Sequence, residues 1–433
     1  MRDLVLALIV FGAIPFILRA PFVGLLTWVW LGIMNPHKLS WGWAFDMPFA
    51  QIVAVCTLLS ILLNSKKLYG FPKDRASIAL ILFVLWLGVS PLFSFHPEEE
   101  FERWLQPTKI IFMTLMALVI VGKRDQVHKL VWALALSVGF FGIKGGIFTL
   151  SSGGSYRVWG PPGGAIADNN ALAVALVMTV PLFRYLQLHT ENKWIRRAAL
   201  AAMGLCAISA IGSQSRGAFL AMAAIGFLLW TKSRQKGLIG LLFVAALPIA
   251  WLLMPESWSE RMLTIQTYDQ DASAMGRINA WQAAWNLAVD RFPIGVGFAF
   301  DNADVFARYA PNPSNVLVAH SIYFQILGQH GFMGLLLFLM VFGFTWLNFG
   351  WVARNTKANP GMAWAHDLAT MSQVTLTGYA VGGAFLNLAF FDLPYYLVVI
   401  SVILRGLVRS RLSDIVNQER LTGQNAAMPL SNS

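Results

Sequence analysis

The chain has 433 residues, of which 57% are apolar and only 12% are charged. A typical soluble domain carries about a quarter charged residues, so this composition excludes both a disordered chain and an ordinary soluble enzyme. The net charge of +11 fits a membrane protein, because cytoplasmic loops of such proteins are rich in Lys and Arg. The sequence therefore indicates a polytopic membrane protein, and binding to nucleic acid is not expected.

Apolar segments recur from end to end, each close to the ~20 residues that cross ~30 Å of hydrocarbon as a helix. The first, 4–34, is too long for one straight crossing and contains Pro15 and Pro21, so it forms one kinked helix or two short ones. Counted once, it gives about twelve spans; counted twice, it places the two termini on opposite sides. The other expected spans are 48–63, 76–92, 106–121, 128–150, 168–184, 196–211, 215–230, 237–254, 319–350, 366–387 and 391–408.

The distribution of basic residues indicates how the predicted spans are oriented in the membrane. About two thirds of the 32 Lys and Arg residues fall in segments on one side, which the positive-inside rule assigns to the cytoplasm. Arg2, the Lys66–Lys67 pair and the arginines of the C-terminal tail belong to this group. Among the remaining basic residues, Arg19 included, arginine outnumbers lysine. Because guanidinium groups bind phosphate as a two-pronged fork, we look for the chemistry on the outer side.

One long connection, 255–318, lies on that outer side and contains a helical stretch near 274–290. It divides the chain into an N-terminal transmembrane bundle, 1–254, the large loop, 255–318, and C-terminal transmembrane helices with a cytoplasmic tail, 319–433. The sequence contains no internal repeat, which weighs against a transporter built from inverted halves.

His320 is the candidate base. It lies in AHSIYFQILGQHGFMG, where the long loop enters a span. Histidine exchanges protons near neutral pH, and ionisable groups at a membrane boundary are usually functional. The simpler alternative is an interfacial histidine that only hydrogen-bonds a neighbour. His330 lies about 15 Å deeper in the same helix, and Gly331 and Gly334 are interpreted as a close-packing face.

Arg216 is the first candidate for binding an anion. It begins a helix after a very short turn in GSQSRG, with Ser213 and Ser215 as possible caps, and a helix N-terminus attracts anions. The alternative is an arginine that merely extends to the membrane surface.

Arg277 is the second candidate, because it shares one helix face with Trp281 and Trp285 at four-residue spacing. The tryptophans suit a helix lying at the membrane interface, from which Arg277 reaches a membrane-anchored phosphate. Arg157, Arg291 and Arg308 are further candidates of lower rank. Asp168, Asn169 and Asn170 precede a span, so helix capping is the expected role for them.

Metal binding is not expected. Asp269 and Asp271 form the only close pair of carboxylates in the outer loop, and no histidine or third carboxylate stands near them. The sequence also contains no HExxH, GxSxG or phosphate-binding loop motif, so neither a metal nor another cofactor is assigned.

Together these motifs resemble the O-antigen ligase and O-antigen polymerase superfamily. The resemblance covers roughly 150–340: SQSRG between two spans, then GRxxxW and FPIGVGFAF in the large loop, then AHSIYFQILGQHGFMG. The chain is most similar to O-antigen ligases and to exosortase-associated O-glycosylation ligases. Ser321 stands where the family often has Asn, and Gln329 where a carboxylate is common.

The resemblance implies an all-α, GT-C-like fold in a bacterial inner membrane, with the large loop and the active site in the periplasm. It implies metal-independent, inverting transfer of a glycan from undecaprenyl diphosphate to the lipid A-core acceptor. In that reaction His320 serves the acceptor hydroxyl, and Arg216 and Arg277 hold the diphosphate.

Three alternatives stay open: a protein O-oligosaccharyltransferase, an O-antigen polymerase and a non-enzymatic flippase for lipid-linked oligosaccharides. The long loop on one side only weighs against the flippase. The sequence does not identify the glycan or the oligomeric state.

Overall fold

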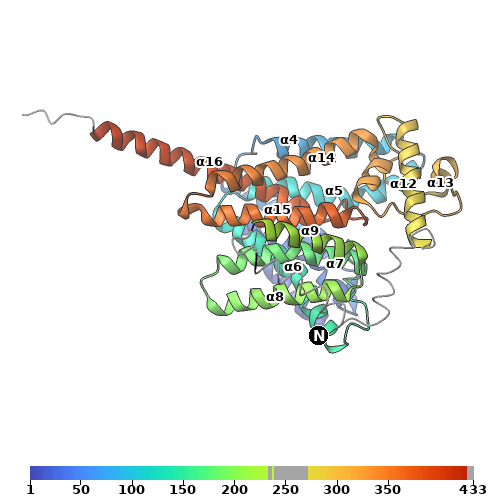
Figure 1. The fold of residues 1–433 in the computed structure, drawn as a ribbon, viewed down its shortest axis with the longest axis horizontal. Helices are drawn as coiled ribbons and strands as arrows, with labels where there is room; N and C mark the ends of the chain where they lie inside the picture. Colours follow the sequence, from blue (N-terminus) through green and yellow to red (C-terminus); the bar gives the residue numbers. More distant parts are fainter. Residues whose placement is uncertain (233–236, 238–271, 427–433) are drawn as a thin grey trace, which may run out of the picture.

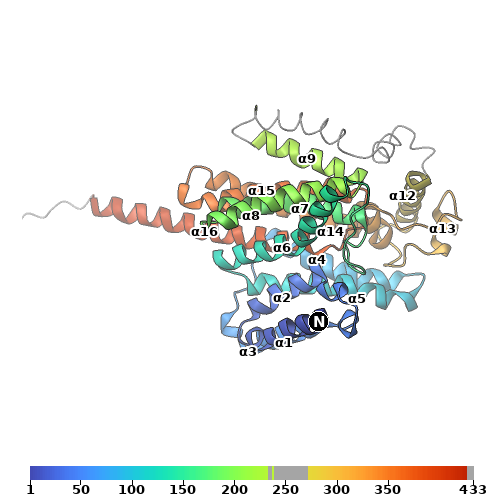
Figure 2. The same ribbon diagram turned by 90° about the horizontal axis from the view of Figure 1, so that it is seen from below.

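A computed structural model describes residues 1–232, 237 and 272–426 of the chain. This part is all-helical and contains no strand, as expected. Most helices lie side by side in one bundle, while α12 (Ala272–Asp290) and α13 (Ala303–Tyr309) cover one end of it (Figures 1 and 2). We call this the α12 end, and the opposite end, from which α16 projects, the tail end. The bundle helices are α1 (Arg2–Arg19), α2 (Pro21–Met34), α3 (Phe49–Leu63), α4 (Arg75–Val89), α5 (Pro97–Ile120), α6 (Arg124–Ser151), α7 (Asn169–Leu188), α8 (Lys193–Gly212), α9 (Arg216–Lys232), α14 (Ile322–Thr356), α15 (Ala363–Gly383) and α16 (Asp392–Ala426).

Within the described residues, seven helices are long and apolar enough to cross a membrane. Three shorter apolar helices, α2, α3 and α9, lie in the same bundle. This arrangement confirms the expected class, a polytopic membrane protein. The count of about twelve spans and the boundaries of the three predicted domains stay predictions. The expected span 237–254 lies outside the described residues except for residue 237.

The N-terminal apolar region forms two antiparallel helices, α1 and α2. Arg2 donates to the carbonyl of Leu39, beyond the end of α2, while Lys67 donates to the carbonyl of Arg19 at 2.7 Å. Arg2 therefore lies away from the Lys66–Lys67 cluster and Arg19 lies beside it, the reverse of the assignment from sequence. The chain turns at Ala20, which is extended because Pro21 follows it. Pro15 lies within α1 and does not end it.

A polar cluster joins three helices at the tail end. Arg405 of α16 binds Asp74 at 3.3 Å and Asn348 of α14 at 2.6 Å, and Asn348 also donates to Asp74. Asp74 in turn caps α4 by accepting from the amide of Ala76. Polar groups inside an apolar bundle are costly unless they pair with one another, so this cluster fixes α4, α14 and α16 together.

Helix α14 is interrupted at Gly331, which adopts φ 69° and ψ −169°. The break leaves carbonyl groups of the first half of α14 without helical partners, and the segment 293–297 supplies new ones. The amides of Val296 and Gly297 donate to the carbonyls of Gly328 and Gln329, at 3.3 and 2.8 Å. On the other side of the break, the amide of Met333 donates to the carbonyl of Pro293. Gly331 is thus a backbone break as well as a site of close packing.

We predict that Gly331→Ala destabilises the protein. Its backbone angles are accessible only to glycine, and a Cβ would lie 2.3 Å from the carbonyl oxygen of Pro293. Strain of this kind costs about 1–3 kcal/mol, before the clash is counted. The matched control is Gly343→Ala in the same helix, where a Cβ meets nothing within 4 Å. Thermal unfolding in detergent should show a lower melting temperature for Gly331→Ala only; equal melting temperatures would contradict the prediction.

Candidate functional site

His320 lies at the α12 end, two residues before α14 begins. Its backbone is left-handed, with φ 45°, and its side chain is half-buried. Burial lowers the pKa of His320 below the ordinary histidine value, the positive charge of Arg277 lowers it further, and Asp168 opposes both. The imidazole is therefore neutral at pH 7 and able to accept a proton.

Helix α12 (Ala272–Asp290) brings Arg277 to this place and confirms the helix expected near 274–290. Trp281 donates to the carbonyl of Ala319 at 2.7 Å, and its ring stacks on Phe324 of α14 at a centroid distance of 5.1 Å. The next turn of α12 packs Trp285 edge-on against Phe332. Trp281 thus joins α12 to the residue preceding His320, while the interfacial role expected for the tryptophans stays a prediction.

The turn before Arg216 lies at the same end. Ser215 caps α9 by accepting from the amide of Ala218 at 3.2 Å, as predicted, whereas the hydroxyl of Ser213 bonds back within α8. Gly217 lies against Phe385 and Gly382, and Ile322 lies against Gly383. The first turns of α9 and α14, which follow Arg216 and His320, therefore meet the same last turn of α15.

Residues of the connection between α6 and α7 complete the group around His320, Arg277 and Arg216. Asp168 caps α7 by accepting from the amides of Asn170 and Ala171, which confirms its predicted role. Asn169 instead donates to the carbonyl of Ser213 at 2.7 Å, and Arg157 bonds Gln214 in the same turn. The structure thus brings the surroundings of Arg157 and Arg216 together, and places His320 within the electrostatic reach of Arg277 and Asp168.

Arg291 and Arg308 gather at a different point. Both guanidinium groups lie over the ring of Phe95, at 4.4 and 4.8 Å, and Arg291 donates to the carbonyl of Phe93 at 2.6 Å. These contacts tie the end of α12 and the short helix α13 (Ala303–Tyr309) to the segment before α5. They provide a structural role for both residues.

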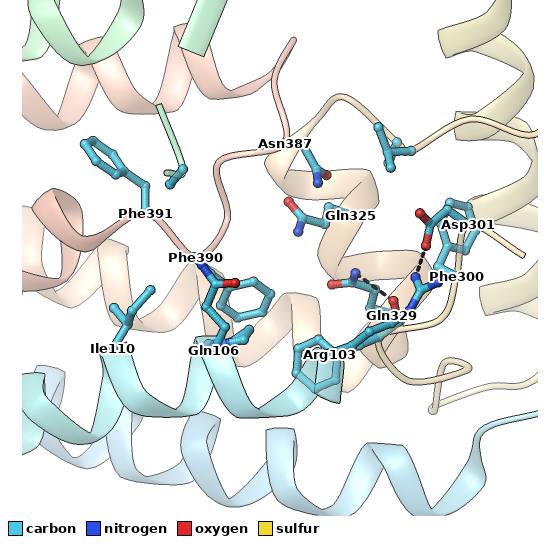
Figure 3. Close-up of a pocket in the computed structure, with 15 residues that line it drawn as sticks. Arg103, Gln106, Ile110, Phe300, Asp301, Gln325, Gln329, Asn387, Phe390 and Phe391 are labelled. Carbon is cyan, nitrogen blue, oxygen red and sulfur yellow. Dashed lines mark hydrogen bonds and ion pairs between the residues drawn. The ribbon is translucent and has the colours of Figure 1, made fainter. Parts of the chain in front are cut away.

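A cavity of about 340 Å³ opens beside this group (Figure 3). Val318 and Ala319, directly before His320, form part of its wall. Arg103 and Asp301 form an ion pair at one side of it. The remaining lining residues are Gln106, Pro107, Ile110, Ala165, Phe298, Phe300, Gln325, Gln329, Asn387, Phe390 and Phe391.

The buried side chain of Glu100 fixes one wall of this cavity. Its side chain is 4% exposed and accepts three hydrogen bonds of 2.9 Å, from the amides of Phe298 and Ala299 and from the hydroxyl of Ser94. The carboxylate therefore holds the loop that carries Phe298 and Phe300 against α5. Gly297, with φ 79°, leaves room for it.

Neither Glu100 nor the cavity was predicted from sequence. The expected span began at 106, whereas α5 begins at Pro97. Glu100 and Arg103 precede Pro107 at helical spacing and continue the face that carries Ile110, and this spacing is the signal that could have placed them inside the bundle. Gln325, Gln329 and Asn387 show no comparable pattern in the sequence.

Asp269 and Asp271 lie outside the described residues. Within 1–232 and 272–426, no group of three or more His, Cys, Asp and Glu side chains is placed to hold a metal ion. The expectation that no metal is required stays a prediction.

The fold and the grouping of these residues define a polytopic membrane protein whose candidate site lies at one end of the bundle. Residues 201–339, which include Arg216, Arg277 and His320, match the family described as O-Antigen ligase. This match confirms the predicted resemblance to the O-antigen ligase superfamily. Residues 1–191 match a family of unknown function, DUF5935. No curated protein matches the chain.

We predict that Glu100→Gln lowers stability. An amide presents only one acceptor oxygen, so at least one of the buried amides of Phe298 and Ala299 loses its partner, at a cost of roughly 1–3 kcal/mol. The control is Glu102→Gln on the same helix, where the side chain is exposed. Thermal unfolding of both variants in detergent checks this, and a Glu100→Gln protein as stable as the control would show that the carboxylate does not hold the loop.

Proposed function

We propose that the protein is a membrane glycosyltransferase of the O-antigen ligase type. It transfers a glycan from undecaprenyl diphosphate to the lipid A-core oligosaccharide at the periplasmic face of the inner membrane. The observation that carries the proposal is the position of His320 at the entry to α14, within the electrostatic reach of Arg277 and within the segment that matches the O-antigen ligase family.

In this reaction the acceptor hydroxyl oxygen attacks the anomeric carbon of the donor glycan. The new glycosidic bond forms as the bond from that carbon to the diphosphate breaks, so a single displacement inverts the anomeric centre. His320 takes the hydroxyl proton, and the diphosphate leaves with the electron pair. Arg216 and Arg277 bind the leaving diphosphate, since fixed guanidinium groups offset developing charge without a metal ion.

The same donor chemistry would serve a protein O-oligosaccharyltransferase, with a Ser or Thr hydroxyl as acceptor, or an O-antigen polymerase, with a glycan chain end. A flippase would move the lipid-linked glycan without breaking a bond. Incubating the purified protein with donor and each acceptor in turn separates the enzymes from one another, and release of undecaprenyl diphosphate separates all of them from a flippase.

We predict that His320→Asn abolishes transfer while donor binding persists. Asparagine tolerates the left-handed backbone at this position but provides no base. In the wild type, the pKa of His320 is lowered, so the imidazole stays neutral at pH values somewhat below the ordinary histidine pKa of about 6.5. The transfer rate should therefore fall only at pH values more acid than this ordinary pKa.

The measurement is transfer by purified protein in excess EDTA, from pH 4.5 to 8. His366→Asn, at the tail end of the bundle, is the matched control. Wild-type rates in His320→Asn would remove His320 from the mechanism. Loss of wild-type turnover in EDTA, restored by Mg²⁺, would show that the reaction needs an ion.

We predict that Arg216→Lys and Arg277→Lys each slow transfer about tenfold or more. Lysine keeps the charge but loses the planar fork that binds phosphate, and ~1.4 kcal/mol of lost transition-state binding gives a factor of ten. Arg196→Lys, on an exposed position of α8, is the control. Steady-state kinetics would contradict the diphosphate assignment if both site variants kept the rate of the control.

A further inference from the structure

The cavity in Figure 3 is lined by four carboxamide side chains from three separate parts of the chain: Gln106, Gln325, Gln329 and Asn387. Gln325 accepts from the amide of Ala389 at 3.2 Å, and Gln329 donates to the carbonyl of Phe298 at 3.3 Å. The side-chain oxygen of Gln329 is buried and has no hydrogen-bond partner within the described chain. Such a buried acceptor normally has a partner, so it points to a ligand that brings a donor.

The other two amides are also available. In the part of the chain that the structure describes, the side chains of Gln106 and Asn387 make no hydrogen bond, and both are exposed. Each carboxamide offers one acceptor oxygen and two donor hydrogens. A ligand whose groups both donate and accept therefore matches this wall.

The charge of the cavity is balanced. Arg103, the only cationic residue among the described residues of its lining, is paired with Asp301 and also binds Glu99 at 3.1 Å. With two carboxylates on one guanidinium, the described lining carries no excess positive charge that would bind a phosphate group. This distinguishes it from the neighbouring region of Arg216 and Arg277.

Aromatic rings form the rest of the wall. Phe298, Phe300 and Phe391 are buried, and Phe390 is half-buried beside them. Glu100 fixes the backbone of Phe298, which limits the movement of this wall. Apolar faces with a few well-placed polar groups, in a volume of about 300–1,000 Å³, are typical of sites for small organic ligands.

We propose that this cavity binds an uncharged sugar residue of the glycan that is presented to His320. Sugar hydroxyls donate and accept, as the four carboxamides require, and the C–H faces of a sugar ring pack on the phenylalanines. Val318 and Ala319 belong both to the cavity wall and to the segment that positions His320, so a sugar held there lies next to the base. The assignment rests on the proposed function, since it takes the glycan as the substrate.

The experiment uses the full-length protein in detergent and saturation-transfer NMR. The probe is the dephosphorylated oligosaccharide mixture that mild acid releases from the lipid carriers and lipopolysaccharide of the host membrane. We expect wild-type protein to bind it, and Gln106→Leu and Asn387→Leu to bind about tenfold more weakly, which corresponds to ~1.4 kcal/mol. Both leave internal hydrogen bonds intact, so folding should be unaffected.

Gln187→Leu is the control, because it makes the same change on α7 at the tail end and removes only an exposed contact with Arg184. It should bind the oligosaccharides as the wild type does. Inorganic pyrophosphate should not displace them. Equal binding by the cavity variants and the control, absence of binding to wild type, or displacement by pyrophosphate would each overturn the proposal.

These measurements distinguish failure of the proposed transferase function from failure of the proposed sugar site. If the wild type binds oligosaccharides through Gln106 and Asn387 but transfers no glycan, the cavity assignment stands and the transferase does not. If the wild type transfers glycan and the Leu variants keep the control's affinity and Michaelis constants, the transferase stands and the cavity assignment does not.

Discussion

The candidate site depends on how backbone groups are paired where α14 is broken. Inside an apolar bundle, an unpaired carbonyl has no water to bind, so a helix break persists only where other groups supply partners. The segment 293–297 provides partners for the carbonyls of Gly328 and Gln329, and Glu100 accepts from the amides of the next two residues, Phe298 and Ala299. This chain of contacts joins α5, α14 and the loop, and it forms one wall of the cavity. It also positions the first half of α14, which begins two residues after His320.

The contacts of α12 complete the arrangement. Trp281 binds the carbonyl of Ala319, and Asn279 binds the carbonyls of Asn312 and Asn315. The backbone segment that leads to His320 is therefore held by α12 at two places, through Asn279 and, on another face of the helix, through Trp281. Arg277 lies one turn before Trp281 on that face, so the contact that fixes the backbone of His320 also brings a positive charge to its ring.

Sequence analysis predicted the parts of this site that have local signals. The periodicity of 274–290 predicted α12, and the residues before the spans predicted that Asp168 and Ser215 cap helices. It did not predict the cavity, since that depends on α5 beginning at Pro97 and on amides brought from positions 106, 325, 329 and 387. A hydropathy pattern excludes polar residues from a span, so Glu100 and Arg103 were assigned to a connection. Only tertiary contacts show that Glu100 is buried by the loop that it binds.

The two halves of the site differ in charge, and the difference bears on the order of events in the proposed reaction. Burial lowers the pKa of His320 and the charge of Arg277 lowers it further, so the imidazole is neutral before the donor binds. A diphosphate bound by Arg277 offsets that charge, so the pKa of His320 rises toward its ordinary value as the donor binds. The base is then neutral in the resting protein and becomes a stronger proton acceptor when the donor is in place. In the cavity, by contrast, Arg103 is already paired with Asp301, so binding of an uncharged sugar there leaves this electrostatic balance unchanged. In the proposed reaction, donor binding would therefore raise the basicity of His320, whichever acceptor supplies the hydroxyl group.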